Sequence, residues 1–472
     1  MDVTALALRA VAARPRVLLA TLPGGTAARL KAERLVRLRD WPLAATPAQA
    51  DLLLIAGPDC PQLHGALDRL WRDLPAPRAR VHALDAEAVG AALDEGRALL
   101  GSLAGQREQA TTAAAAAREG GRQQSETSEG ADETGDDEHP DWRGKNGEHE
   151  DEDGGLHQDG DTPHGGGQVH TDETDRETRS GHEGQEEPNG GGHGGHQEHG
   201  GHDHGDMEMP GGLPMAEQGQ DRDGLTLDRL HVPLGPFLAD WPAGLSIRMT
   251  VQGDVVQEAV LQESVMPGHR GEAFWVQPWL RAAAGEPVTA GEAARRRAAA
   301  RLDSLARLLA VAGWPAEAVA ARRLRDDLLD GAPATALAPR LDRLARRVGR
   351  SRTLAWLTRG IGQLSTTPAR QAGVSGPAAR AGGDVTDRYR QWLADIRRDM
   401  GRLTEGSALR PAADESPRGH WRDDDPPSAA LIKLMPGLLT GEELAAARLI
   451  VASLDPDLDE LAAARREAGA HG

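Results

Sequence analysis

The sequence contains a single cysteine, Cys60, among 472 residues. One thiol excludes an internal disulfide, and it excludes any zinc or iron–sulfur site whose ligands are all cysteines of this chain. A lone cysteine in a short loop next to apolar segments is typical of a small buried residue, and we interpret Cys60 in this way.

Long apolar runs are also missing. No stretch approaches the ~18 apolar residues that a membrane-spanning helix needs, and residues 1–25 show no apolar core followed by a small-residue cleavage site. We therefore expect a cytoplasmic protein with no transmembrane segment of its own. Aromatic residues are few, and we see no concentrated basic face interleaved with them, so we expect no nucleic-acid partner.

Residues 121–220 have almost no Leu, Ile, Val or Phe, and they carry 27 acidic and 5 basic residues, a net charge of −22. Such a segment cannot bury enough apolar surface to offset the entropy lost on ordering, and its like charges repel one another. We expect a disordered, acidic His/Gly-rich linker over residues 106–223. It would separate one domain at residues 1–105 from another at residues 224–472.

The linker holds eleven of the seventeen histidines. Five of them recur every two or three residues: His193, His196, His199, His202 and His204. Neutral imidazoles at this spacing bind Zn²⁺ or Ni²⁺ without a fold, so these five are the candidate metal ligands. The alternative is a solvated low-complexity tether with adventitious metal affinity.

The N-terminal half alternates strands and helices. Residues 16–22, 50–57 and 78–84 are nearly continuous apolar runs, which suit strands buried on both faces of a small parallel sheet. Residues 63–74 have the spacing of an amphipathic helix, and residues 86–103 are expected to form a closing helix. This order predicts an open α/β domain.

Residues 41–86 resemble the 20 kDa subunit family of NADH:ubiquinone oxidoreductase (complex I), which is shared with [NiFe] hydrogenase small subunits. The resemblance rests on Pro-x-Gln-Ala-Asp at residues 47–51, the strand LLLIAGP, the helix that follows and Leu-Pro-x-Pro-Arg at residues 74–78. It implies a [4Fe–4S] cluster on four cysteines. This chain has one thiol, Cys60, which is not at a ligand position of the family, so we expect no cofactor in this domain.

The C-terminal half begins with a hairpin and continues as helices. Residues 245–251 and 255–261 are strand-like runs joined by Gln252-Gly253-Asp254, which is a turn signal. From residue 290 onward the spacing predicts helices, so the domain is mainly helical α+β with a short N-terminal β-hairpin. Several arginines lie away from the Leu/Ala stripes, and we interpret them as a solvated face, the alternative being a surface for an acidic partner. They are Arg295–Arg297, Arg322, Arg323, Arg346 and Arg347.

This half resembles the 49 kDa subunit of complex I and the large subunits of group 4 [NiFe] hydrogenases. Residues 234–259 resemble the family's opening, and His269-Arg270-Gly271 resembles its His-Arg-Gly run. Residues 427–461 resemble its terminal helix and Ser-x-Asp-Pro. Residues 373–383 (GVSGPAARAGG) resemble its glycine-rich run, in which glycines allow close backbone approach and the arginine lines the cleft. The matching positions are Gly373, Gly376, Pro377, Arg380 and Gly382.

The functional positions of this family are replaced. Its quinone-site histidines would fall between Phe237 and Gly244, where there is no histidine. Its hydrogenase relatives carry a cysteine pair just after Asp-Pro, whereas Asp455-Pro456 is followed by DLDEL. His231 and His269 lack a partner at metal-ligand spacing, and we expect structural roles for them. We predict no catalytic and no cofactor-binding residue.

The two halves of this single chain thus resemble two neighbouring subunits of one electron-transfer module, one after the other. We expect a subunit of a complex I-like, membrane-associated, ion-translocating assembly, a redox-inactive scaffold that docks on membrane antiporter-like, proton-conducting subunits. The chain would be peripherally membrane-associated through those partners. The alternative is a soluble His-rich protein that buffers or delivers nickel or zinc. A third reading, an iron–sulfur oxidoreductase subunit, leaves enzymatic activity open.

Overall fold

The computed structural model describes residues 3–112, 217–220, 226–262, 273–420 and 426–463. The chain divides into two compact units, one made of Met1–Gly121 with Met215–Gly472 and the other of Arg122–Pro214. The first unit is described by itself. Residues 113–216 and 221–223 of the predicted linker, which include the five candidate metal-binding histidines, lie outside the described residues, as does His269. The ends of the predicted linker are ordered, since residues 106–112 are helical and residues 217–220 form a strand.

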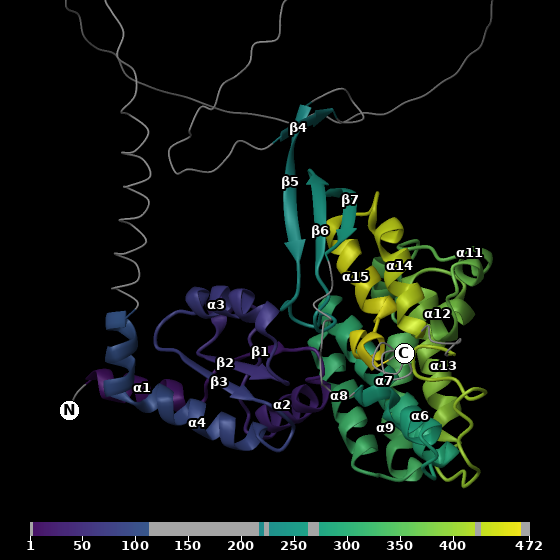
Figure 1. The fold of residues 1–472 in the computed structure, drawn as a ribbon, viewed down its shortest axis with the longest axis horizontal. Coiled ribbons are helices and arrows are strands. Elements are labelled where there is room, and N and C mark those ends of the chain that lie inside the picture. The colour runs from purple at the N-terminus through teal and green to yellow at the C-terminus, as the bar shows by residue number, and fades with distance from the viewer. Residues whose placement is uncertain (1–2, 113–216, 221–225, 263–272, 421–425, 464–472) are drawn as a thin grey trace, which may run out of the picture. The chain divides into compact units, whose positions relative to one another are not determined.

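The N-terminal part is a small parallel sheet with helices on both faces (Figure 1). Its strands, in the order β1-β2-β3, are β1 (Val17–Thr21), β2 (Leu52–Ala56) and β3 (Ala79–Ala83). All five residues of β2 are buried because it is the central strand and is covered on both faces. The predicted α/β fold and its three strands are confirmed.

Helix α3 covers one face of this sheet, and α2 and α4 cover the other. The bounds are α1 (Val3–Ala13), α2 (Thr26–Leu38), α3 (His64–Asp73) and α4 (Val89–Gly101). Helix α2 was not predicted, because arginines and a lysine interrupt its apolar stripe. Its charged residues Arg29 and Glu33 face the helical part, where they pair with Asp303 and Arg325.

The second part begins with an antiparallel sheet in the order β4-β5-β6-β7. Its strands are β4 (Glu217–Gln220), β5 (Thr226–Leu234), β6 (Ile247–Gln252) and β7 (Val255–Leu261). The predicted hairpin is β6–β7, and its turn uses Gly253 at a positive φ of 62°. Strands β5 and β4 extend it on one side.

The remainder is helical, as predicted. The longer helices are α7 (Ala290–Val311), α8 (Pro315–Leu329), α9 (Ala334–Gly349), α13 (Val385–Met400), α14 (Pro427–Leu439) and α15 (Leu444–Leu454). The shorter ones are α6 (Gln277–Ala283), α10 (Arg352–Thr358), α11 (Thr366–Gln371) and α12 (Gly376–Ala381). Helix α7 is central, because α8, α13 and α15 all pack against it. No helix in the described ranges is long and apolar enough to cross a bilayer.

Candidate functional site

A cavity of about 730 Å³ opens where the N-terminal sheet meets the helical part. Strand β1, helix α2 and the residues after α2 form one side, and helix α8 with loop 236–243 forms the other. Its apolar wall includes Leu18, Val36, Trp41, Phe237, Trp241 and Val319. A cavity of this volume with a largely apolar wall is typical of small-molecule sites.

Loop 236–243 is fixed by two close contacts at its ends. The indole N–H of Trp241 donates to the carbonyl of Leu245 at 2.7 Å. Gly235 has a φ of 93°, and a Cβ there would lie 2.1 Å from the same carbonyl oxygen, so the position requires glycine. The loop is therefore held in one conformation, with Phe237 and Trp241 in the cavity wall.

Asp240 brings a carboxylate to the cavity. It has a left-handed φ of 58°, which is uncommon for a residue with a side chain. Its carboxylate accepts a hydrogen bond from Arg322 on α8. Burial raises the pKa of Asp240 above its usual value, and the charge of Arg322 opposes that rise.

The polar part of the cavity is rich in guanidinium groups. Five arginines and three carboxylates line it: Arg29, Arg37, Arg307, Arg322, Arg323, Glu33, Asp40 and Asp240. Four of the arginines are paired with carboxylates, and Arg323 has no ion-pair partner among the described residues. An apolar wall beside guanidinium groups suits a ligand with an apolar body and an anionic or electron-rich head.

An ion network beside this cavity joins the two parts of the chain. Arg29 on α2 donates to Asp303 on α7 at 2.7 Å and to Glu33 at 2.8 Å. Arg325 on α8 donates to Glu33 at 2.8 Å and to Asp303 at 2.5 Å. Arg322 also lies 3.5 Å from Glu33. Each buried carboxylate therefore has at least two cationic neighbours.

These contacts keep both carboxylates ionised. Burial alone would raise the pKa of Glu33, but the charges of Arg325, Arg29 and Arg322 outweigh it and lower the pKa to about 2. The pKa of Asp303 is likewise held well below its usual value against the effect of burial, by Arg29, Arg325 and Arg307.

The interpretation of the arginines as a solvated face is wrong for part of the set. Arg297 is only 5% exposed and is paired with Asp399 at 2.9 Å, and Arg322 faces Glu33 and Asp240. Arg323, Arg346 and Arg347 are exposed, as that interpretation requires. The buried members have carboxylate partners far away in the sequence, and spacing along one helix does not reveal such partners.

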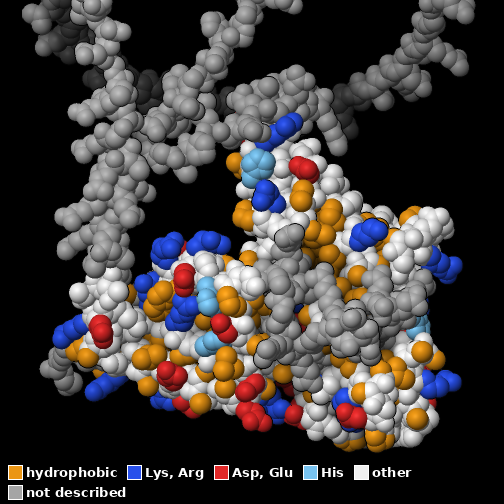
Figure 2. Space-filling view, in the orientation of Figure 1, with side chains coloured by type: hydrophobic (Ala, Val, Ile, Leu, Met, Phe, Trp, Pro, Cys, Tyr) orange, Lys and Arg blue, Asp and Glu red, His pale blue; other side chains and the backbone are white. Residues whose placement is uncertain are grey.

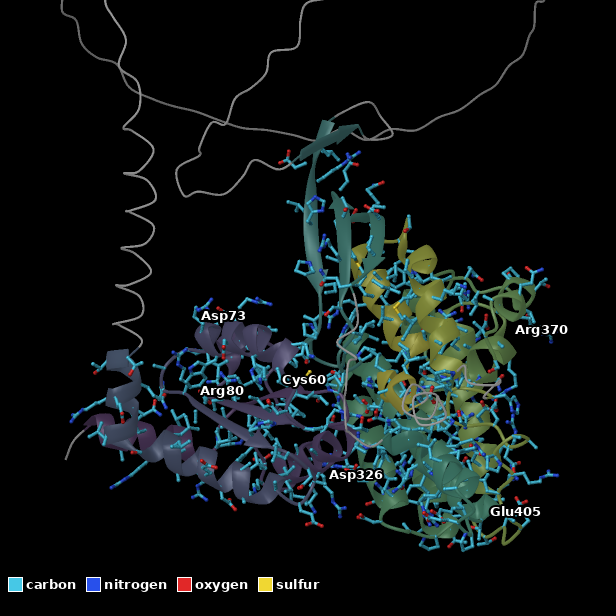
Figure 3. The ribbon with its side chains drawn as sticks, viewed as in Figure 1. Cys60, Asp73, Arg80, Asp326, Arg370 and Glu405 are labelled. Carbon is cyan, nitrogen blue, oxygen red and sulfur yellow. The ribbon has the colours of Figure 1, made fainter. Side chains whose placement is uncertain are left out.

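The network reaches the surface at the edge where α2 meets α8. Arg37 is paired with Asp326, and Arg34 donates to Asp330 at 2.5 Å. Figure 2 shows acidic and basic side chains next to each other along this edge, and Figure 3 shows Asp326 on the side of α8 that faces the N-terminal part.

A second cluster lies just after α15. Asp455 ends that helix in a left-handed conformation, and Arg418 donates to both its carbonyl and its carboxylate at 2.6 Å. Asp459 accepts a hydrogen bond from the backbone N–H of Gly24 at 2.6 Å and from the hydroxyl of Thr26 at 3.1 Å. It therefore holds the residues at the beginning of α2 against the other part of the chain.

The neighbouring carboxyls Asp457 and Glu460 stand at the two positions after Asp455-Pro456 where the resemblance to hydrogenase large subunits would place a cysteine pair. Burial and the charge of Asp457 raise the pKa of Glu460 to about 8 and that of Asp459 to about 7. One carboxyl oxygen of Asp457 and one of Glu460 have no hydrogen-bond partner among the described residues. This cluster can hold protons at neutral pH. The resemblance singled out this run for its missing cysteines, but no sequence pattern showed that its carboxyls are buried together.

Asp457 also lines a cavity of about 30 Å³ between the two parts, together with Thr26, Arg29 and Arg418. That volume is enough for about one or two water molecules. A cavity of this size beside partly unsatisfied carboxyls can hold water that exchanges protons with them.

The family-like glycine run is structural in this chain. Gly376 has a φ of 72°, and a Cβ there would lie 2.3 Å from the carbonyl oxygen of Arg418. Pro377 is the first-turn proline of α12 and Gly382 ends that helix at a φ of 55°. Gly373 also has a positive φ, 83°. Arg380 is paired with Glu415 at 2.5 Å and Asp395 at 2.8 Å, so its charge is used within the protein.

The residues present do not fit an iron–sulfur cluster. Such a cluster needs several thiolates, and Cys60 is the one thiol of the chain. Cys60 is buried in the loop after β2, at the edge of the N-terminal part that lies nearest the helical part (Figure 3), and burial raises the pKa of its thiol. Within the described ranges, no three His, Cys, Asp or Glu residues are placed to hold a metal ion. His231 is exposed, and one of its ring nitrogens lies 3.2 Å from the hydroxyl of Thr250.

No family model and no curated protein match this sequence. Among solved structures, the chain is similar to one chain of the membrane-bound sulfane sulfur reductase (MBS), an archaeal respiratory membrane complex. The similarity covers 49% of this chain and 98% of that chain, with 16% sequence identity and a TM-score of 0.35. At this TM-score the similarity assigns neither a family nor a function.

Proposed function

We propose that the chain is a scaffold subunit of a complex I-like, membrane-associated, ion-translocating assembly. It docks on antiporter-like membrane subunits and carries out no redox chemistry of its own. The observation that carries the proposal is that two stretches resembling neighbouring subunits of that assembly pack together within one compact unit. Glu33 lies in the N-terminal part and Asp303 in the helical part, and both contact Arg29 and Arg325.

The junction between the two stretches supports the same proposal. Loop 236–243, where the resemblance places quinone-site histidines, lines the large cavity with Phe237 and Trp241 and contains no histidine. The positions of the hydrogenase cysteine pair hold Asp457 and Glu460, which cannot replace thiolates at a nickel–iron centre. Both observations support an interface that serves packing and carries no redox ligands.

Isolation of the tagged full-length chain from the membranes of its native cells tests the proposal. Antiporter-like membrane subunits should be recovered with it in fixed proportion after mild detergent extraction. Recovery of the chain with no such subunit, from membranes or from the soluble fraction, would contradict membership of the assembly.

Analysis of iron and acid-labile sulfide in the same preparation tests the redox-inactive role separately. Neither should follow the chain through purification. Iron with sulfide and a broad cluster-like absorption would overturn that role and leave membership of the assembly standing.

The second candidate function is metal buffering or delivery by the linker. The sequence observation that favours it is the close spacing of His193, His196, His199, His202 and His204. Replacing all five by Gln should abolish bound zinc or nickel if this is the function, and should leave membrane-subunit recovery unchanged. Metal content equal in both proteins would contradict it.

A further inference from the structure

One part of the helical region is strongly basic. Between residues 331 and 383 there are nine arginines and a single acidic residue, Asp342. Three arginines of α9 and the residue that caps its end recur at the spacing i, i+3, i+4, i+7, which puts them on one face of that helix. They are Arg343, Arg346, Arg347 and Arg350, and all are exposed.

The opposite face of α9 is buried in the core. Leu337, Leu341, Leu344 and Val348 are each at most 4% exposed. Because the apolar side chains hold that face inward, the arginine face points to solvent. This face differs from the one that the sequence analysis looked for, because no aromatic residue is interleaved with its arginines.

The next helix, α10, carries exposed residues of the same kind at its start, in its middle and just past its end. It begins two residues after Arg350, and Arg352, Trp356 and Arg359 follow the spacing i, i+4, i+7. Trp356 is 81% exposed, whereas Leu354 and Thr358 on the inner face are buried. An indole this exposed contributes nothing to the core of the chain.

The guanidinium groups of this surface are largely free. Arg347 is paired with Glu317 at 3.0 Å, and Asp342 lies 3.8 Å from Arg397. Five exposed arginines on α9 and α10 have no ion-pair or side-chain hydrogen-bond partner among the described residues: Arg343, Arg346, Arg350, Arg352 and Arg359. We call these five arginines and Trp356 the basic face.

We propose that the basic face binds the anionic headgroups of a lipid bilayer directly. Guanidinium groups pair with phosphate through two parallel hydrogen bonds, and tryptophan favours the boundary between headgroups and acyl chains. Nucleic acid would also satisfy the arginines, but single strands are held by a series of stacked aromatics, and the basic face has one. This inference concerns contact with lipid and does not depend on the antiporter-like partners.

Sedimentation of the purified full-length chain with lipid vesicles tests the proposal. One set of vesicles contains phosphatidylcholine alone and the other also contains phosphatidylglycerol. The chain should sediment with the second set at low salt and much less at high salt, because exposed charges are screened. Each basic residue near such a surface raises the partition coefficient of the chain between vesicles and solution by about fivefold.

Replacement of Arg343, Arg346, Arg350 and Arg359 by Gln should lower the partition by about two to three powers of ten. Trp356→Ala should lower it with little change in its salt dependence. The matched control replaces four exposed arginines of the N-terminal part that also lack ion-pair partners in the described chain: Arg69, Arg72, Arg97 and Arg107. It changes the net charge equally and should leave the partition unchanged.

Three results would overturn the proposal. The first is that the wild-type chain does not bind anionic vesicles. The second is that the basic-face variant and the control variant lose vesicle binding equally. The third is that the chain prefers a single-stranded nucleic acid when vesicles and nucleic acid are offered together. Circular dichroism of the variants excludes misfolding as the cause of a loss. Failure of this experiment would leave recovery with membrane subunits, and hence the proposed function, untouched.

Discussion

At the scale of single residues, buried carboxyls give this protein an unusual pH dependence. The pKa values of Glu460 and Asp459 are raised to about 8 and about 7. In the unfolded chain such groups lose their protons near pH 4. Between about pH 4 and pH 8 the folded state therefore holds more protons than the unfolded state, and the free energy of unfolding falls as pH rises through this window.

Glu460→Gln should reduce the fall in the free energy of unfolding between about pH 4 and pH 8. The amide cannot ionise, and its oxygen can still accept the hydrogen bond from the hydroxyl of Ser428. We expect the variant to be more stable than the wild type by about 1–4 kcal/mol near pH 9, and close to it near pH 4. Urea denaturation across this range measures the difference. Glu108→Gln at an exposed position is the control, and an unchanged pH profile in Glu460→Gln would contradict the assignment.

Gly376 is a second residue whose role can be tested. Alanine there would need a φ of 72° and would place a Cβ 2.3 Å from the carbonyl oxygen of Arg418. Backbone strain of this kind costs about 1–3 kcal/mol before the clash is counted. Gly376→Ala should therefore lower the free energy of unfolding by more than Gly331→Ala, because a Cβ at Gly331 meets nothing within 4 Å although its φ is also positive. If the two variants lose the same free energy of unfolding, backbone strain alone causes the loss and the clash with Arg418 contributes nothing.

At the scale of elements, the sequence predicts well wherever apolar periodicity decides the structure. Strands β1, β2 and β3, the hairpin β6–β7 and the long helices appear where predicted, because their apolar faces form the cores. Helix α2 was not predicted because its buried face carries Arg29 and Glu33, whose partners lie on α7 and α8. Sequence periodicity cannot show that a charged residue is buried against a charge almost 300 positions away.

The candidate site, too, was predicted in part. The sequence singled out loop 236–243 and the run after Asp455, each through a resemblance, and both lie at the junction. The cavity itself depends on how α2, α8 and that loop pack, and no local pattern encodes this. The five candidate metal-binding histidines lie outside the described residues, so metal binding by them stays a prediction.

The ion network makes the contact between α2, α7 and α8 sensitive to single changes. Arg325 is fully buried and contacts Glu33, Asp303 and Asp326. Arg325→Leu would leave buried carboxylates with fewer cations, so the free energy of unfolding should fall by about 3–5 kcal/mol. Arg340→Leu, which removes an exposed pair with Asp327, should change it by less than about 1 kcal/mol. Similar losses from the two changes, measured by urea denaturation, would contradict the role of the network.

Acid should weaken the same contact. Glu33 and Asp303 have lowered pKa values, about 2 for Glu33, so their contribution is present above the unfolded values near pH 4. It is lost as pH falls from about 4 toward about 2. Glu33→Gln should lower stability at neutral pH and flatten this acid limb. An acid limb as steep as that of the wild type would mean that other carboxylates produce it.

At the scale of the whole molecule, the two described parts are held together by contacts as well as by the linker. Arg29, Glu33 and Asp459 join α2 to the helical part through charge-assisted hydrogen bonds, and loop 236–243 packs beside β1. The linker supplies a high effective concentration of one part for the other, but it makes none of these contacts. If the two parts correspond to two partner subunits, as the resemblance implies, their interface should hold without a covalent connection.

Cleavage of the folded full-length chain tests this requirement. A protease site inserted between Gly166 and Gly167 would separate the two parts covalently after purification. The fragments should stay together in gel filtration, because the contacts between them all remain. These contacts are the ion network, the hydrogen bonds from Gly24 and Thr26 to Asp459, and the apolar wall of the cavity. The cleaved Glu33→Gln chain should dissociate more readily, by about 2–5 kcal/mol, since Arg325 loses its charged partner on α2. The cleaved Glu87→Gln chain, changed at an exposed position, should behave as the wild type. Separation of the wild-type fragments at low salt would mean that the linker holds the two parts together, and it would contradict the correspondence of the two parts to two self-sufficient partner subunits.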